Sequence, residues 1–249
     1  MAHWRDGSRR RSADVGEVQA RLLLATAAVA LTVVALVGST ATATSDRTCV
    51  TGTRAGGYSY AGHQAASRGH GIRATITLTQ PPTVDAGHVA GWIGVGGQGQ
   101  GANGGDAWIQ AGIASLRRLG TVVYAEMTRE AASPELVVVD DDVVVGRAYR
   151  IAVLEVGGRP GWWRVWVDGE PVAGPVRMPG TSGRWAPIAT AESWNGGTSA
   201  CNDFAFRFDR VSVSAGTRGA WRRFVSGHRF LDGTHRLRDL GDSFVASSG

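Results

Sequence analysis

Apolar and polar residues alternate along most of the chain beyond residue 70. The alternation is clearest in residues 73–79 (RATITLT), 107–113 (AWIQAGI), 148–154 (AYRIAVL), 162–169 (WWRVWVDG) and 204–208 (FAFRF). Successive side chains of a β-strand point to opposite faces, so a period of two predicts strands that each have one buried face. No comparable helical period follows residue 43. The chain is therefore expected to fold as an all-β protein.

Turn signals separate these segments. The chain has 36 Gly against 8 Pro, and both Asp168-Gly169 and Asp232-Gly233 predict two-residue hairpin turns, because glycine supplies the positive φ that matches strand twist. The alternation changes phase between Phe208 and Val211, which predicts a β-bulge near Asp209-Arg210. About ten to thirteen short strands with this spacing predict a two-sheet antiparallel sandwich of the jelly-roll type. One such domain is expected over residues 57–249, after a linker at 44–56.

The N-terminal segment has the pattern of a targeting signal. Four arginines between positions 9 and 21 precede an apolar run at 22–38 (LLLATAAVALTVVALVG), and Ala41-Thr42-Ala43 then offers a small-residue cleavage site. This order predicts a signal peptide at 1–43 that is cleaved after Ala43. The alternative is an uncleaved hydrophobic helix at 22–38, which is just long enough to anchor the protein in the cell membrane. Both predict an extracytoplasmic protein, either secreted or membrane-anchored.

The basic residues of the chain are all arginines. The sequence contains 26 Lys+Arg, and none of them is a lysine. Phosphate-binding P-loop enzymes, Schiff-base enzymes and protein kinases are thereby excluded, because each needs the lysine amine itself. The net charge is +5. Residues 1–43 hold five Arg and three acids, so 21 Arg and 18 acids remain, a dispersed +3 that predicts no nucleic-acid partner.

Neither a cofactor nor a metal ion is predicted. Residues 99–104 fit the pattern G-x-G-x-x-G, but an expected strand follows them where dinucleotide binding requires a helix. His63, His70 and His88 lack the tight spacing of metal ligands.

The two cysteines, Cys49 and Cys201, both follow the apolar segment. An exported chain meets an oxidising compartment, so a disulfide between them is expected. It would close a loop of 152 residues, which the chain-entropy model values at about 4–5 kcal/mol. Two unpaired thiols are the alternative.

Several strands carry aromatic or polar residues opposite their aliphatic set. Trp108 shares a face with Gln110, Tyr124 shares one with Glu126, and residues 162–166 present Trp, Arg and Trp on a third. The solvent side of a sandwich sheet rarely exposes such residues, so they predict a lined cleft or a platform on which sugar or peptide stacks. An extended peptide or a polysaccharide is the expected ligand. The predicted ligand-binding residues are Trp92, Trp108, Tyr124, Trp162, Trp166 and Trp194.

A family resemblance is carried by six segments in order. They are SYAGHQAASRGHGIRATITLTQPP, GWIGVGG, AWIQAG, VVYAEM, VVVGRAYRIAVLEV and ATAESW. In order and spacing they resemble the glutamic peptidases (eqolisins) and their bacterial relatives, from about residue 57 to residue 213. The resemblance implies a bent, concanavalin A-like double sheet whose cleft holds a catalytic Gln and Glu that hydrolyse peptide bonds at acid pH. Gln110 lies where the family has its catalytic Gln, and Glu126 matches a Glu that the family carries on the next strand.

The sequence departs from the family where the chemistry requires an acid. The family's last active strand has two Glu, of which the second is catalytic; Glu192 matches the first, and Gly196 stands at the catalytic position. Gly96 replaces an Asp of the cleft. Residues 192 and 196 would share a strand face, but a carboxylate ~13 Å away along a strand does not reach the same water. Gln110, Glu126 and Glu192 remain the candidate catalytic residues.

Three hypotheses follow for the function. The first is an exported, non-catalytic peptidase-like domain that binds an extended peptide or glycan in an aromatic-lined cleft, and the missing Glu favours it. The second is an active acid endopeptidase that uses Gln110 with Glu192 or Glu126. The third is a structural envelope domain held at the membrane by an uncleaved leader.

Overall fold

The computed structural model describes residues 49–51, 54, 57–129 and 132–249. The predicted leader at 1–43, with its apolar segment at 22–38, lies outside these residues, as does most of the predicted linker. Among the described residues, no helix has the length and apolarity needed to cross a membrane.

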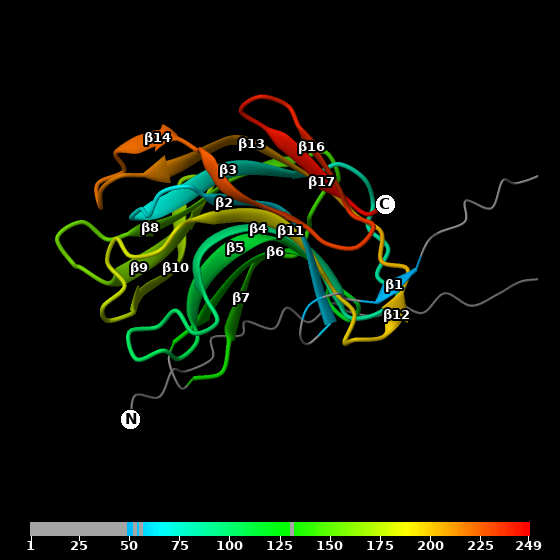
Figure 1. Ribbon diagram of the computed structural model, residues 1–249, viewed down its shortest axis with the longest axis horizontal. Coiled ribbons are helices and arrows are strands. Elements are labelled where there is room, and N and C mark those ends of the chain that lie inside the picture. The colour runs from blue at the N-terminus through cyan, green and yellow to red at the C-terminus, as the bar shows by residue number, and fades with distance from the viewer. Residues whose placement is uncertain (1–48, 52–53, 55–56, 130–131) are drawn as a thin grey trace, which may run out of the picture. The chain divides into compact units, whose positions relative to one another are not determined.

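Two antiparallel sheets form a β-sandwich, which confirms the predicted fold class (Figure 1). One sheet has seven strands in the order β15-β2-β11-β4-β5-β6-β7. Their bounds are β2 Tyr58–Ala65, β4 His88–Gly97, β5 Ala107–Leu116, β6 Gly120–Thr128, β7 Glu135–Asp140, β11 Ile188–Trp194 and β15 Ser226–Leu231.

The other sheet has eight strands. Seven follow the order β10-β9-β8-β3-β13-β17-β16, and β14 pairs with β13 beside this path. Their bounds are β3 Gly71–Leu78, β8 Ala148–Glu155, β9 Trp162–Val167, β10 Glu170–Arg177, β13 Ala205–Ser214, β14 Trp221–Arg223, β16 Arg236–Asp239 and β17 Phe244–Ser247. In Figure 1, β3 and β13 lie over β4, β5 and β11, and both sheets are bent into an arch.

The alternation of the sequence decides which side chains fill the space between the sheets. All five alternating sets are buried there: Ala74, Ile76 and Leu78; Ile109, Ala111 and Ile113; Tyr149, Ile151 and Val153; Trp163, Val165 and Val167; Phe204, Phe206 and Phe208. Phe206 packs directly on Gly91 of the facing sheet, where an added Cβ would lie 2.5 Å from the ring. The core is therefore built from residues spaced by two along each strand, as the pattern predicts.

Two of the three predicted local features are confirmed. Asp168 and Gly169 have φ of 51° and 97° and join β9 to β10 in a hairpin. The pairing of β13 with β3 shifts between Asp209 and Ser212, and Arg210 has φ of 52°, so a bulge lies at the predicted place.

The hairpin predicted at Asp232-Gly233 is wrong. β15 before it pairs with β2 in the seven-stranded sheet, whereas β16 after it pairs with β17 in the other sheet. The Asp232 carboxylate accepts hydrogen bonds from the Tyr60 N–H and from the Arg54 guanidinium. These contacts hold a connection that passes from one sheet to the other, and a local turn pattern carries no signal for such a crossing.

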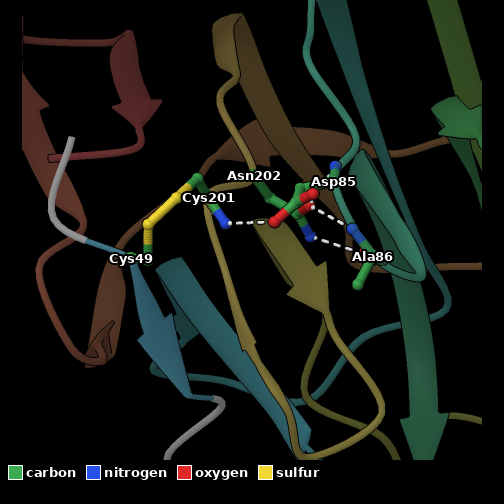
Figure 2. The surroundings of a disulfide bond; sticks show 5 residues. All are labelled: Cys49, Asp85, Ala86, Cys201 and Asn202. Atoms are coloured by element: carbon green, nitrogen blue, oxygen red, sulfur yellow. Dashed lines mark hydrogen bonds between the residues drawn. A yellow bond between two sulfur atoms is a disulfide. The ribbon is translucent and has the colours of Figure 1, made fainter.

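The start of the described chain is tied to the sandwich. β1 (Val50–Thr51), within the expected linker, pairs with β12 (Ser199–Ala200), and Cys49 forms the predicted disulfide with Cys201 (Figure 2). The Cys201 N–H donates to the Asp85 carboxylate, and the Asn202 amide binds the backbone of Asp85 and Ala86. The disulfide thus joins the early segment to a hydrogen-bonded corner of the sandwich.

Candidate functional site

A cleft of about 580 Å³ lies on the face of the seven-stranded sheet that points away from the core. The two faces of this sheet are distinguished by the alternation: odd-numbered residues of β4 and β5 fill the sandwich, and even-numbered ones face the cleft. Six strands (β2, β4, β5, β6, β11 and β15) contribute side chains. The residues that line the cleft include Tyr58, Tyr60, His88, Trp92, Trp108, Gln110, Glu126, Thr190 and Glu192.

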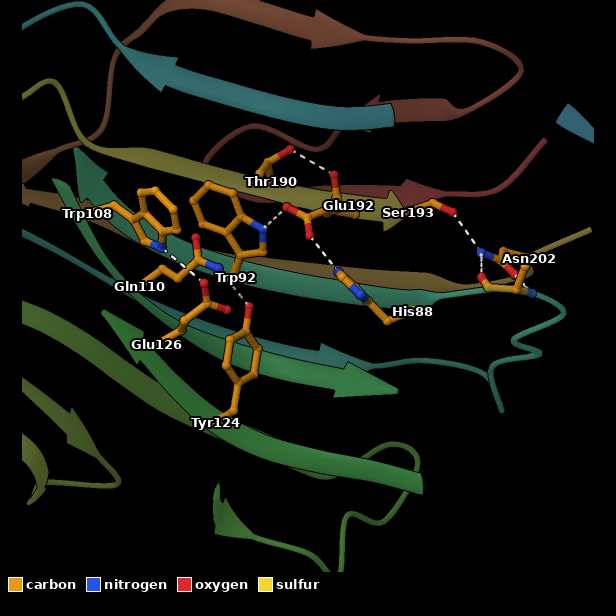
Figure 3. Close-up of polar contacts among 12 residues, drawn as sticks. His88, Trp92, Trp108, Gln110, Tyr124, Glu126, Thr190, Glu192, Ser193 and Asn202 are labelled. Atoms are coloured by element: carbon orange, nitrogen blue, oxygen red, sulfur yellow. Dashed lines mark hydrogen bonds and ion pairs between the residues drawn. The ribbon is translucent and has the colours of Figure 1, made fainter. Parts of the chain in front are cut away.

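Gln110 and Glu126 are direct cross-strand partners in the middle of the cleft (Figure 3). Directly opposite residues of an antiparallel pair have Cβ atoms about 5 Å apart, so the amide and the carboxyl lie side by side. The Trp108 indole N–H donates to Glu126 Oε1 at 3.1 Å, and Gln110 Nε2 donates to the Tyr124 hydroxyl at 3.4 Å. Both polar groups are thereby oriented by aromatic neighbours.

Glu192 projects into the same cleft from β11. Its side chain is buried, with 8% exposed, and its two oxygens have different donors. His88 Nε2 lies 2.9 Å from Oε1, and the Trp92 indole N–H donates to Oε2 at 3.1 Å (Figure 3). A buried carboxylate is stable only when its lone pairs are satisfied in this way. The three side chains form the polar end of the cleft.

Two glycines allow the strands on either side of Gln110 to approach closely. Gly94 is the β4 partner of Gln110, and an added Cβ there would lie 2.7 Å from the Gln110 Cβ. Gly112, two residues further along β5, would place its Cβ 2.1 Å from the carbonyl oxygen of Gly91. An added Cβ at either position would collide with the neighbouring strand, so the glycines allow the close approach of β4 and β5 that places Gln110 in the cleft.

Burial perturbs the ionisable groups of the cleft. It raises the pKa of the Glu126 carboxyl above its ordinary value of 4.5, and the charge of Glu192 adds to this, while the hydrogen bond from Trp108 opposes it. Burial also raises the pKa of the Tyr124 and Tyr60 hydroxyls, with a further contribution from Glu192 in each case. Both tyrosines therefore stay protonated, and Glu126 retains its proton to a higher pH than a free carboxyl.

Because its folded-state pKa is raised, Glu126 favours the folded protein only at acid pH. The folded state binds the proton more tightly, so this contribution is present below pH 4.5 and is lost as the pH rises through the folded-state value. We expect Glu126→Gln to raise the free energy of unfolding at pH 7. At about pH 3.5 the substitution should bring no such gain, because the carboxyl is then protonated in both the folded and the unfolded protein. Urea denaturation at both pH values measures this, with the exposed Glu170→Gln as the control. Equal effects at both pH values would contradict it.

The cleft contains only part of the predicted aromatic set. Trp92, Trp108 and Tyr124 lie on its face, and Trp194 extends it at the end of β11, where its ring lies 5.4 Å from His88 and 6.2 Å from Tyr58. The remaining two predicted residues lie outside this cleft. Trp162 and Trp166 belong to β9 in the eight-stranded sheet and face outward on the opposite side of the sandwich. Alternation gives a residue's face but not its sheet.

The family resemblance implies that position 196 lies on the same strand as Glu192, and the structure places it elsewhere. β11 ends at Trp194, and Gly196 and Gly197 follow in a turn with φ of 66° and 78°. Gly196 does not line the cleft, whereas Glu192 does. The acid that β11 offers to the cleft is therefore Glu192 itself.

Some cleft residues were not anticipated from the sequence. Tyr60 and His88 contribute to the polar end, and Arg54 lies 5.2 Å from the Tyr60 ring and 5.4 Å from that of Phe230. His88 and Trp92 are four residues apart on β4, so their side chains point to the same face. This even spacing could have predicted that the histidine lies on the same face as the tryptophan. Phe230 comes from β15, and its pairing with β2 has no local signal. Among the described residues, no cluster of three or more His, Cys, Asp or Glu is arranged to hold a metal ion.

No protein-family model and no curated protein matches the sequence. The fold is similar to several solved structures. One is scytalido-glutamic peptidase with a transition state analog inhibitor (13% identity, TM-score 0.49), and another is SCP-B, a member of the Eqolisin family of peptidases (12% identity, TM-score 0.47); each match covers 76% of this chain and 97% of that chain. A third is a tetrameric galectin from the ball sponge Cinachyrella sp. (10% identity, TM-score 0.35), covering 63% of this chain and 99% of that one. At such identities the similarity concerns the fold alone.

Proposed function

We propose that the cleft binds an extended peptide. The observation that carries this is the convergence of one side-chain amide, two carboxyl groups and several aromatic rings on a single sheet face that is otherwise floored by glycine and alanine. A peptide chain presents alternating N–H donors and C=O acceptors. Gln110 offers a donor for a carbonyl, and the carboxyl groups of Glu126 and Glu192 offer acceptors for N–H groups.

The aromatic residues supply the apolar part of such a site. Trp92 and Trp108 lie on the cleft face of neighbouring strands, each with its indole N–H already bonded to a glutamate. Their rings are therefore fixed, and the apolar surface they present costs little side-chain entropy when a ligand covers it. Ligand sites typically combine such apolar walls with a few oriented polar groups.

A second candidate function is hydrolysis of the bound peptide at acid pH. The observation that favours it is that Glu192 and Gln110 line the same cleft, although the sequence suggested that the required acid is missing. A carboxylate that accepts a proton from water acts as a general base, and an amide N–H stabilises the oxyanion that forms on the attacked carbonyl. The Glu192 carboxylate also interacts with the Tyr60 hydroxyl, so one lone pair remains for a water after the bonds from His88 and Trp92.

One assay at about pH 3 to 5, the range in which carboxyl groups titrate, tests both candidates. The protein is mixed with a denatured protein substrate and with a library of fluorescent peptides, and both binding and cleavage are measured. We expect peptide binding that weakens about tenfold or more in Gln110→Ala, the loss expected when a buried hydrogen bond to the ligand is removed. Cleavage that disappears in both Gln110→Ala and Glu192→Gln would show that the cleft hydrolyses peptides. Binding without cleavage would show that it only binds them.

The matched control is Gln100→Ala, an exposed glutamine between β4 and β5 that does not line the cleft. It should bind peptide as the unchanged protein does. Absence of any peptide binding, or binding that Gln110→Ala leaves intact, would refute the proposed function.

A further inference from the structure

A second hollow lies on the opposite side of the sandwich, on the outward face of the eight-stranded sheet. Its volume is about 460 Å³, and it is bordered by Arg73, Arg150, Arg210, Trp166 and Trp221. It shares no residue with the cleft of the seven-stranded sheet. In Figure 1 its strands, β3, β8 and β9, belong to the layer that covers β4 and β5.

Strand pairing builds this hollow from residues far apart in sequence. Arg73 on β3 pairs with Ala152 on β8, and Ala152 pairs with Trp166 on β9. Strands are spaced about 4.8 Å apart, so the arginine and the tryptophan stand ~10 Å from each other with a small residue between them. Arg150 and Thr75 form the next pair on the same face. Ala152 is therefore the floor, and Arg73 and Trp166 are the two walls.

The charge of the hollow is positive and largely unneutralised. None of its lining residues is acidic. Arg150 lies 3.5 Å from the exposed carboxylate of Asp168, but Arg73 and Arg210 form no ion pair with any described residue. The Arg73 guanidinium lies over the Trp221 ring at 4.5 Å from its centroid, which fixes the cation at the wall and leaves the edge of its N–H groups available.

A tryptophan beside oriented guanidinium groups matches a specific ligand chemistry. Sugar rings stack their C–H faces on indole rings, and guanidinium groups bind carboxylate or sulfate in a bidentate fashion. We propose that this hollow, with Arg73, Arg150, Arg210 and Trp166 as its binding residues, is a site for an acidic glycan, a polysaccharide whose units carry carboxylate or sulfate groups.

An acidic glycan is favoured over a single-stranded nucleic acid, which also uses arginine and aromatic residues. The Cys49–Cys201 disulfide is typical of chains that fold in an oxidising compartment outside the cytoplasm. The hollow is also lined by only two tryptophans, one of which is already covered by Arg73, whereas a single-stranded nucleic acid uses a series of rings on which successive bases stack. The volume of about 460 Å³, between Arg73 and Trp166, suits one or two sugar units.

Binding of defined oligosaccharides to the protein tests the proposal. The probes are hexagalacturonate and a heparin hexasaccharide as acidic glycans, maltohexaose as the neutral glycan, and an oligothymidylate as the nucleic acid. We expect binding of at least one acidic probe, no binding of maltohexaose, and an affinity that falls as salt is raised. Arg73→Gln should weaken that binding about tenfold or more, as expected for loss of a charge-assisted hydrogen bond. Ala152→Phe should abolish it by filling the floor without changing the charge.

Two controls separate this site from the rest of the surface and from the cleft. Arg117→Gln removes an exposed arginine from the β5–β6 turn and should leave the affinity unchanged. Gln110→Ala changes the cleft and should also leave acidic-glycan binding unchanged, so the two sites succeed or fail independently. Failure of both acidic probes to bind, equal binding of maltohexaose, tighter binding of oligothymidylate, or an unchanged affinity in Ala152→Phe would each overturn the proposal.

Discussion

Replacing Cys201 with serine is expected to lower the free energy of unfolding by as much as about 4–5 kcal/mol. The disulfide joins positions separated by 152 residues, so it removes a large part of the conformational freedom of the unfolded chain. The folded chain loses little, because Cys201 follows β12 and its N–H is held by Asp85 (Figure 2). The effect acts mainly through the unfolded state.

Urea denaturation at neutral pH measures this change. Cys49→Ser should have the same effect as Cys201→Ser, because each removes the same cross-link, and the double variant should be no less stable than either single one. Unchanged protein treated with a reductant should match the variants. A loss below about 1 kcal/mol in all three cases would contradict the expectation, because it would mean that the cross-link barely restricts the unfolded chain.

Glu192→Ala is expected to destabilise the protein by about 2–4 kcal/mol. The carboxylate is the acceptor for His88 Nε2 and for the buried Trp92 indole N–H, and its removal orphans both. Trp92 is only 8% exposed, so water cannot readily replace the lost acceptor. This cost is independent of whether the cleft is catalytic, since it arises from unsatisfied donors rather than from a reaction.

A double-mutant cycle isolates the orphaned indole. Trp92→Phe removes the N–H but keeps an aromatic ring, so Glu192→Ala should cost less in the Trp92→Phe background than in the unchanged protein. Thermal or urea unfolding of the four proteins gives the coupling energy. Glu135→Ala is the matched control, because this glutamate is half exposed and interacts only across 3.6 Å with an exposed arginine. Strict additivity of the two cleft substitutions would show that the hydrogen bond contributes nothing.

The faces of the strands were predictable because they depend on local geometry. A residue's side of a strand follows from its position alone, so the buried sets at 74–78, 109–113 and 204–208 follow from the order of the amino acids. The same rule placed Gln110 with Trp108, and Glu126 with Tyr124, on faces that border one cleft. The bulge at Arg210 was visible as a change of phase.

Pairing between distant strands was not predictable, because it depends on which sheet a strand joins. Trp162 and Trp166 have the same local pattern as Trp108, yet β9 lies in the other sheet, and these residues face away from the cleft. Asp168-Gly169 and Asp232-Gly233 are the same dipeptide, but only Asp168-Gly169 connects two strands that pair with each other. In each case the local sequence is equivalent and the long-range partner is different.

The place where β11 ends decided the interpretation of Glu192. The family resemblance put the essential acid at position 196, which assumes that the strand continues to that residue. The positive φ of Gly196 and Gly197 turns the chain away after Trp194. Glu192, which the sequence offered only as a displaced substitute, is the β11 acid that lines the cleft beside Trp92.

The sequence by itself determined the class of structure, the buried face of each strand, the pair of cysteines and the side chains available for binding, because each of these follows from local periodicity or from composition. Only the tertiary structure decided how those side chains are grouped: Gln110, Glu126 and Glu192 in one cleft, and Arg73, Arg150 and Trp166 in a separate hollow on the other side. The physical reason is that the alternation of side chains along a strand determines which face is buried. Pairing between strands is made by backbone N–H and C=O groups, which are the same whatever the side chains, so the local sequence does not specify the partner strand.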